Sequence, residues 1–176
     1  TTSSGTSVSS DTAMRQATVY GCVNVLSRTL GQLPCHLYRR VGQKQKEVAV
    51  DHDLYDLLHD QPNEWMTAPE FWGMCMNHLA LRGNFFALKQ RAPVSKKVVE
   101  LLPLAPGIVQ EVEQNKDYSL TYKCKLPDGT EKNVPTAEVV HIRGMVSNGY
   151  MGVNPIQYIR ESIGLGLAAE EFGARY

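Results

Sequence analysis

The residues of this chain that could do chemistry are its four cysteines and five histidines. Cys75 and His78 are three residues apart in a segment expected to be helical, so both could lie on one face and form half of a metal site. No second pair with ligand spacing completes the set. We therefore expect core packing at these positions and predict that the chain binds no metal.

A thiol and an imidazole could also act together as nucleophile and base. Cys75 and His141 are such a pair, because the two groups need to be adjacent only in the folded chain. Beyond the presence of both residue types, nothing in the sequence supports this pairing. A cysteine hydrolase is therefore the weaker alternative, and no catalytic residue is assigned.

Motifs that bind cofactors are missing from the sequence. Neither G-x-x-x-x-G-K-[ST] nor G-x-G-x-x-G occurs, so we expect no nucleotide and no other cofactor. The glycines of residues 147–153 could offer backbone amides to an anion, but a flexible loop is the favoured interpretation.

Length and charge limit the other classes of function. A chain of 176 residues with 43% hydrophobic content is expected to form one domain. The 18 basic and 18 acidic residues cancel, so no summed field attracts nucleic acid or an anionic membrane. No apolar run approaches the roughly 20 residues of a membrane span, and the first residues lack the basic and apolar regions of a signal peptide. We expect a soluble, intracellular protein.

The elements that position these residues begin after a polar segment. Residues 1–10 are rich in Ser, Thr and Gly and predict a disordered tail or linker. Residues 11–33 predict one helix, capped by Ser10 or Asp11 and ended by Pro34. Its apolar residues recur at spacings of four and three and draw a single stripe: Val19, Val23, Leu26, Leu30 and Leu33.

The stretch QPNEWMTAPEFW holds both tryptophans of the chain. Thr67 and Glu70 have the spacing of a capping box, and Pro69 suits a first turn, so a helix is expected at Ala68–Arg82. This helix is apolar on most sides, so it must lie inside the domain or be covered by another chain. The candidate packing or subunit-interface anchors are Trp65, Phe71, Trp72 and Met76.

The remaining segments alternate strands and turns before a last helix. A hairpin and a short helix are expected between residues 35 and 60, and five or six strands between residues 84 and 144. Asn154 caps the final helix, with Pro155 at its first position. The layout predicts an α+β fold of helices packed on antiparallel strands and hairpins, with residues 11–176 as a single domain. Because the final helix is still running at residue 176, we expect the chain to be truncated there.

Several segments, taken in order, resemble the phage portal proteins of the HK97 type. The resemblance covers residues 8–176, and six segments in the family's order make it specific. They are VYGCVNVLSRTLGQLPCHLYRR, DHDLYDLLHDQPNEWMTAPEFW, LALRGNFFAL, ELLPLAP, EVVHIRG and GYMGVNPIQYI. The chain is similar to the amino-terminal, wing-like part of a portal subunit, and the stem, clip and crown of a full portal are expected to be absent.

The resemblance implies a structural protein of the virion and no enzyme. Such subunits form a dodecameric ring at the portal vertex, assembled in the host cytoplasm, through which DNA is packaged and ejected. The implied partners are further copies, the major capsid protein, the large terminase subunit and a head-tail adaptor. Double-stranded DNA passes without sequence-specific binding, and no membrane is involved. We expect the isolated chain to be a monomer or weak oligomer; the alternative function is a small adaptor whose exposed aromatics bind a peptide.

Overall fold

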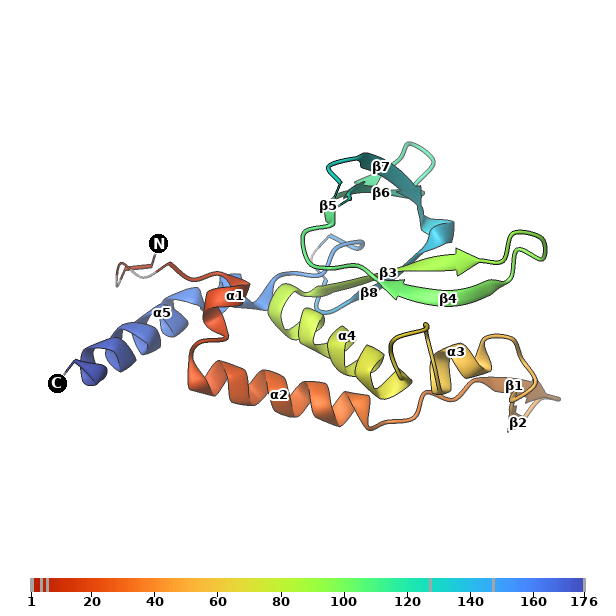
Figure 1. Cartoon of the computed structure of the whole chain (residues 1–176), viewed down its shortest axis with the longest axis horizontal. Helices are drawn as coiled ribbons and strands as arrows, with labels where there is room; N and C mark the ends of the chain where they lie inside the picture. Colours follow the sequence, from red (N-terminus) through yellow and green to blue (C-terminus); the bar gives the residue numbers. More distant parts are fainter. Residues whose placement is uncertain (1, 4, 6, 127, 147, 176) are drawn as a thin grey trace.

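Helices and small antiparallel sheets are stacked in layers in this molecule (Figure 1). The structure is a computed structural model that describes residues 2–3, 5, 7–126, 128–146 and 148–175. The helices are α1 (Ser10–Ala13), α2 (Ala17–Gly31), α3 (Tyr55–His59), α4 (Ala68–Arg82), the 3-10 turn η1 (Thr136–Glu138) and α5 (Pro155–Ala174). The strands are β1 (Tyr38–Val41), β2 (Gln45–Val48), β3 (Asn84–Arg91), β4 (Val98–Pro103), β5 (Val109–Gln114), β6 (Leu120–Lys125), β7 (Glu131–Pro135) and β8 (Val139–Arg143). The predicted α+β class is confirmed.

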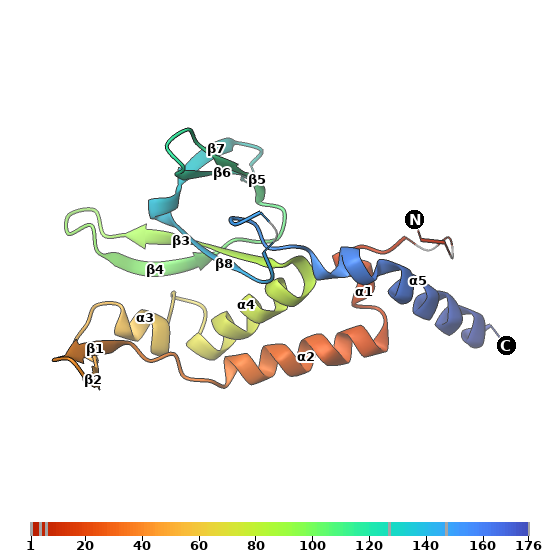
Figure 2. The ribbon, with the colours of Figure 1, turned by 180° about the vertical axis from the view of Figure 1, so that it is seen from behind.

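Helix α4 lies at the centre of the layers. Helix α2 runs along one side of it, and the sheet with strand order β4–β3–β8 lies along the other (Figures 1 and 2). The second sheet, with order β5–β6–β7, covers the far face of the first sheet. Helix α4 therefore lies inside the domain, where α2 and the first sheet cover its many apolar residues. Among the helices that the structure describes, none is both long and apolar enough to cross a membrane.

The central strand β3 is buried on both of its faces. Phe85 and Ala87 are each 0% exposed and pack in one cluster with Phe71 of α4. Phe86 packs instead in the cluster around Tyr122 of the second sheet. Because successive side chains of a strand point to opposite faces, alternate residues of β3 supply the two cores.

The single helix predicted over residues 11–33 is wrong, because the structure divides it into α1 and α2. Ser9 caps α1 by accepting from the backbone N of Thr12 at 3.1 Å. The side chain of Gln16 caps α2 by accepting from the backbone N of Val19 at 2.9 Å. Two caps seven residues apart start two helices, and the residues between them form a turn.

The amino-terminal segment is more ordered at its described positions than a disordered tail would be. Thr2 is 7% exposed, and its side chain lies beside the bare Cα of Gly164 in α5. The Oε2 atom of Glu161 accepts from the N and Oγ of Ser3 at 3.0 and 2.8 Å. These contacts attach the segment to α5, because a glycine leaves room there for a second chain segment. Residues 1, 4 and 6 of the predicted tail lie outside the described residues.

The entry to α5 is fastened to the first sheet by a hydrogen-bonded cluster that we call the Asn84 junction, formed by Tyr122, His141, Asn84 and Gly152. Asn84 Nδ2 donates to Gly152 O, and Gly152 N donates to Asn84 Oδ1, each at 2.8 Å. His141 Nε2 lies 2.9 Å from the same Oδ1, and the Tyr122 hydroxyl lies 3.2 Å from His141 Nδ1. Because an amide oxygen only accepts, Nε2 carries the proton and Nδ1 accepts from the tyrosine.

Two glycines allow the backbones to meet at this junction. Gly83 ends α4 with a φ of 74°, in the left-handed region expected after Arg82. A Cβ added to Gly83 would lie 1.8 Å from Val153 O, and one added to Gly152 would lie 1.9 Å from Gly83 O. Neither position can therefore carry a side chain unless the entry to α5 moves.

Replacement of Gly83 tests how tightly the junction is built. We expect Gly83→Ala to lower the free energy of unfolding by about 2 to 5 kcal/mol, the sum of a left-handed penalty and overpacking. Gly107→Ala is the matched control, because its φ is 91° and an added Cβ would meet nothing within 4 Å. The control should cost about 1 to 2 kcal/mol in urea unfolding. Equal losses for the two variants would contradict the close contact.

The protonation of His141 provides a second test of the junction. Burial, and then the charge of Arg143, lowers the pKa of His141 to about 4 from the usual 6.5. As pH falls from 6.5 towards 4, the unfolded chain therefore binds a proton at this site that the folded chain does not. We expect the free energy of unfolding to fall with pH in this window, and to fall less in His141→Gln. Urea unfolding at pH 7, 6 and 5 measures the slope, and parallel slopes would contradict the assignment.

Candidate functional site

Two of the candidate anchors pack inside the subunit. Phe71 is 0% exposed, and its ring meets Phe85 edge to face with 5.3 Å between ring centroids. Trp72 is half-buried and meets Phe71 at 5.2 Å, while its Nε1 donates to Leu58 O at 2.9 Å. The indole of Trp72 therefore ties α3 to α4, and both aromatics stabilise the fold.

Trp65 differs from the other aromatics because it is 65% exposed on a well-fixed loop. Asn63 is 3% exposed, donates from Nδ2 to Leu101 O at 2.9 Å, and accepts from Trp65 N at 3.2 Å. The backbone of Pro62 accepts from Leu101 N at 2.7 Å. These hydrogen bonds fix the loop to β4, while its largest apolar side chain, Trp65, faces outwards. Trp65 therefore does not stabilise the core as a buried side chain would.

Helices α2 and α4 approach each other through small residues. A Cβ added to Gly31 of α2 would lie 2.6 Å from Pro69 O, and one added to Gly73 of α4 would lie 3.3 Å from Ser27 O. Close backbone approach brings the two helices together along their glycines. The large side chains of α2 are consequently turned to its other sides.

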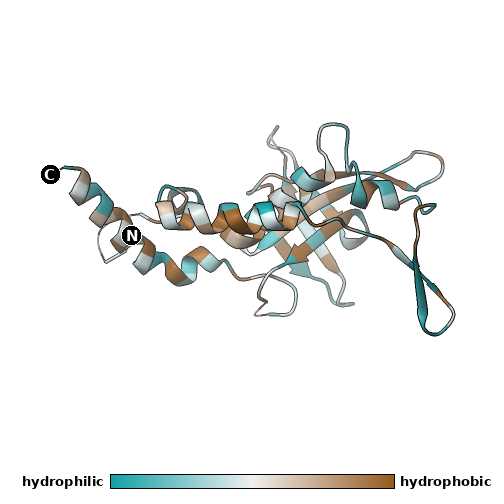
Figure 3. Ribbon diagram, turned by 90° about the horizontal axis from the view of Figure 1, so that it is seen from below, coloured by the Kyte–Doolittle hydropathy of each residue, from teal (hydrophilic) through white to brown (hydrophobic). Residues whose placement is uncertain are grey.

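Exposed apolar side chains remain around α2 and just after its end, and Figure 3 shows several hydrophobic, brown segments along this helix. The predicted stripe is wrong as a buried face, because only Val23 of its five residues is buried, at 5% exposure. Val19 packs against the same core cluster as Val23, whereas Leu26 and Leu33 of the stripe are exposed. The exposed side chains, with their exposed fractions, are Tyr20 (55%), Val25 (63%), Leu26 (47%) and Leu33 (58%).

Met76, the fourth candidate anchor, is half-buried and belongs to none of the clusters of buried side chains.

The predicted helix caps lie where the sequence suggested. The capping box has Glu70 Oε2 accepting from the N and Oγ1 of Thr67, each at 2.8 Å. These hydrogen bonds lower the pKa of the Glu70 carboxyl. Asn154 Oδ1 accepts from Ile156 N at 3.0 Å and caps α5.

The thiol and imidazole of the hydrolase hypothesis lie on opposite faces of the first sheet. Cys75 packs with Phe85 on the α4 side, whereas the His141 ring packs on Phe86, 4.3 Å away, on the other side. Burial raises the pKa of Cys75 to about 12 and lowers that of His141 to about 4. The two residues therefore form no nucleophile–base pair, and neither is easily charged at neutral pH.

The half-site predicted from Cys75 and His78 gains no further ligands in the part of the chain that the structure describes. The His78 ring packs against Phe85 with 5.7 Å between centroids, and burial, followed by the charge of Arg82, lowers its pKa. No group of three His, Cys, Asp or Glu residues among the described positions could hold a metal ion. Both residues contribute to packing around α4.

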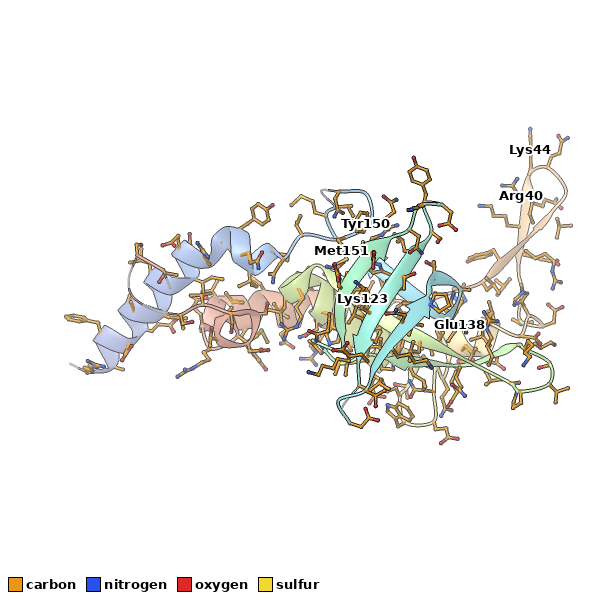
Figure 4. All side chains as sticks on the ribbon, turned by 90° about the horizontal axis from the view of Figure 1, so that it is seen from above. Arg40, Lys44, Lys123, Glu138, Tyr150 and Met151 are labelled. Atoms are coloured by element: carbon orange, nitrogen blue, oxygen red, sulfur yellow. The ribbon has the colours of Figure 1, made fainter. Side chains whose placement is uncertain are left out.

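The glycine-containing loop before α5 uses its amides for its own structure. Asn148 Oδ1 accepts from Tyr150 N at 3.2 Å and from Met151 N at 2.8 Å, and Gly152 N is bound to Asn84. Tyr150 and Met151 pack against the core of the second sheet, and Figure 4 shows both beside it. These amides are therefore not available to an anion; Ser147 lies outside the described residues.

Comparison with known proteins gives a consistent result. The profile of the family described as phage portal protein matches residues 17–176. Protein BeeE of Escherichia coli strain K12 is 44% identical over 108 residues, which are 61% of this chain and 67% of that protein. The portal protein of Enterobacteria phage HK97 is 29% identical over 168 residues, which are 94% of this chain and 38% of that protein.

Solved structures share the fold. A chain in the neck of an empty gene transfer agent particle matches with a TM-score of 0.76 at 16% identity, over 94% of this chain and 45% of that one. An HK97-family phage portal protein from Corynebacterium diphtheriae matches with a TM-score of 0.64 at 13% identity, over 97% and 50% of the two chains. The present chain thus spans half or less of these structures. Because the family profile covers residues 17–176, the chain belongs to the phage portal protein family.

Proposed function

We propose that this chain is the wing-like part of a portal subunit and has a structural role in a ring at the capsid vertex. The observation that carries the proposal is the set of large apolar side chains left exposed on α2 and at Trp65 after the core is complete. Exposed apolar patches rimmed by polar residues mark sites that other protein surfaces cover. Trp65 and the outer face of α2 are the two surfaces we assign to contacts between subunits.

A ring explains why two different surfaces are exposed. In a closed ring with head-to-tail contacts, each subunit offers one surface to the neighbour before it and another to the neighbour after it. The matched gene transfer agent necks were computed with C6 and with C12 symmetry, and cyclic symmetry of either order is consistent with a ring; the number of twelve subunits rests on the resemblance to the family. For the full-length protein we propose the major capsid protein, the large terminase subunit and a head-tail adaptor as partners. The proposed location is the virion, after assembly in the host cytoplasm, with DNA passing through without sequence-specific binding.

The proposal assigns no catalysis and no cofactor to the chain. Support comes from the separation of Cys75 and His141 by the first sheet and from the packing roles of both side chains. In this interpretation the role of the subunit is structural: it supplies shape and contact surface, while a separate motor supplies energy.

A charge placed on the outer face of α2 tests the proposed interface. Val25→Glu should disrupt rings of the full-length protein in electron micrographs, because a carboxylate would be buried without a partner. Val94→Glu makes the same chemical change at a position that is 94% exposed on the β3–β4 turn, and it should leave rings intact. Intact rings in Val25→Glu would remove α2 from the interface.

The two tryptophans should respond differently to truncation. Trp72→Ala is expected to cost about 3 kcal/mol of unfolding free energy, since it removes a core ring and a hydrogen bond. Trp65→Ala should change the unfolding free energy by less than about 0.5 kcal/mol but weaken assembly, as a surface anchor does. Thermal melts and ring counts from the same preparations measure both effects. Unchanged assembly in Trp65→Ala would exclude it as a contact.

A further inference from the structure

The β1–β2 hairpin projects from the body and carries closely spaced positive charges. All eight residues of its two strands are exposed. Arg40 lies directly opposite Lys46 in the antiparallel register, and Lys44 lies in the turn between the strands. Figure 3 shows the hairpin as a hydrophilic ribbon away from the core, and Figure 4 shows Arg40 and Lys44 near its tip.

Three of the four positive charges of the hairpin have no carboxylate partner among the described residues of the subunit that carries them, and Arg39 is the exception. Arg39 pairs with Asp51 at 2.9 Å and with Glu47 at 3.9 Å. Within the part of the chain that the structure describes, Arg40, Lys44 and Lys46 pair with no carboxylate. Like charges directly opposite each other destabilise an isolated hairpin, so the arrangement favours an acidic partner.

An acidic segment follows the hairpin in the same chain. Residues 51–64 contain five carboxylates and neither Lys nor Arg. Asp51 is bound to Arg39, and Asp53 is bound to Lys97 at 2.6 Å. The carboxylates left without a Lys or Arg partner in the described residues are Asp56, Asp60 and Glu64.

Apolar side chains accompany the charges on both surfaces. The register places Tyr38 opposite Val48, two residues from the Arg40–Lys46 pair and therefore on the same face of the hairpin. Tyr38 is 56% exposed and Val48 is 40% exposed. On the acidic side, Trp65 is 65% exposed next to Glu64. Each surface thus combines charge of one sign with exposed apolar area.

We propose that the β1–β2 hairpin of one copy docks on the acidic 56–65 segment of a neighbouring copy. The inference rests on the proposed ring and names two surfaces that would meet in it. Salt bridges at the edge of such a contact set its register and steer association, while Trp65, Tyr38 and Val48 supply the apolar area. The contact is head-to-tail, because the two surfaces are different.

A second copy fits the hairpin better than nucleic acid does. A nucleic-acid partner would call for an excess of positive charge, whereas the 18 basic and 18 acidic residues of this chain balance. Docking between copies pairs the three cations Arg40, Lys44 and Lys46 of one with three carboxylates of the next that have no Lys or Arg partner in the described residues, and it keeps this balance. Asp60 is bound within its own chain to His59 Nδ1 at 2.8 Å. A phosphate backbone remains the competing partner that the experiment must separate.

A charge-swap experiment tests the docking. The hairpin variant carries Arg40→Glu and Lys46→Glu, the acidic-segment variant carries Asp60→Lys and Glu64→Lys, and a third variant carries all four changes. The control carries Lys123→Glu and Arg175→Glu, because these cations already pair with Glu111 at 2.9 Å and with Glu171 at 2.5 Å. Sedimentation velocity at 50 and 300 mM salt measures self-association, and thermal melts verify that each variant folds.

The expected pattern separates the two inferences. Each two-site variant should associate about tenfold more weakly than the original chain at 50 mM salt. At 300 mM the difference from the original chain should be smaller, because salt screens exposed ion pairs. The four-site variant, and a mixture of the two-site variants, should recover to within about threefold of the original chain, and the control should stay in that range. Failure of the four-site variant to recover self-association would overturn the docking. Variants that keep self-association but lose binding to a 30-base-pair DNA duplex would also overturn it. Unchanged association in the hairpin variant, with loss in Val25→Glu, would overturn this inference alone, and a full-length protein that forms no rings in electron micrographs would overturn both.

Discussion

The burial of β3 on both faces is the constraint on which the rest of the structure depends. A strand with Phe85 and Ala87 on one side and Phe86 on the other needs two separate covers. Helix α4 supplies one cover, and the β5–β6–β7 sheet supplies the other. The β4–β3–β8 sheet separates Cys75 from His141, so the packing that builds the two cores also removes the arrangement that catalysis would need.

The position of α4 has a consequence for α2. Because α4 is apolar on most sides, its far side also needs a cover, and α2 supplies it through the contacts at Gly31 and Gly73. Glycine contacts bring two backbones close but bury little side-chain area. Larger residues of α2, including Val25 and Leu26, are therefore left outside. Exposed apolar surface therefore remains on α2, as expected of a surface that neighbouring subunits cover.

Sequence reasoning succeeded where structure is determined by residues close together in the chain. The capping box of Thr67 and Glu70, the left-handed Gly83 and the strand at Asn84–Arg91 all follow from local rules. It failed where distant segments decide. Gln16 is not among the residues that usually cap helices, so the break before α2 gave no signal. The close approach of α2 to α4 depends on Gly73, which lies 42 residues after Gly31 in the chain.

The candidate interface shows the same division. The sequence identified Trp65, Phe71 and Trp72 as a set of anchors, but their spacing could not separate core from surface. That separation comes from Asn63, whose amide holds the loop to β4 and directs Trp65 outwards. No periodic pattern encodes a single buried amide, although an asparagine after proline in a turn-rich segment is a usable signal for side-chain bonds to the backbone.

Net charge alone conceals how the charges of this chain are arranged. The sum of zero was first an argument against any strong electrostatic partner. The structure divides that sum into a basic hairpin and an acidic segment that the chain does not pair within itself at Arg40 or Glu64. Because the molecule is neutral, two copies do not repel each other electrostatically at long range. At short range the basic hairpin of one copy is complementary to the acidic segment of another. The proposed docking would neutralise these charges between copies and would leave no excess of positive charge to hold nucleic acid.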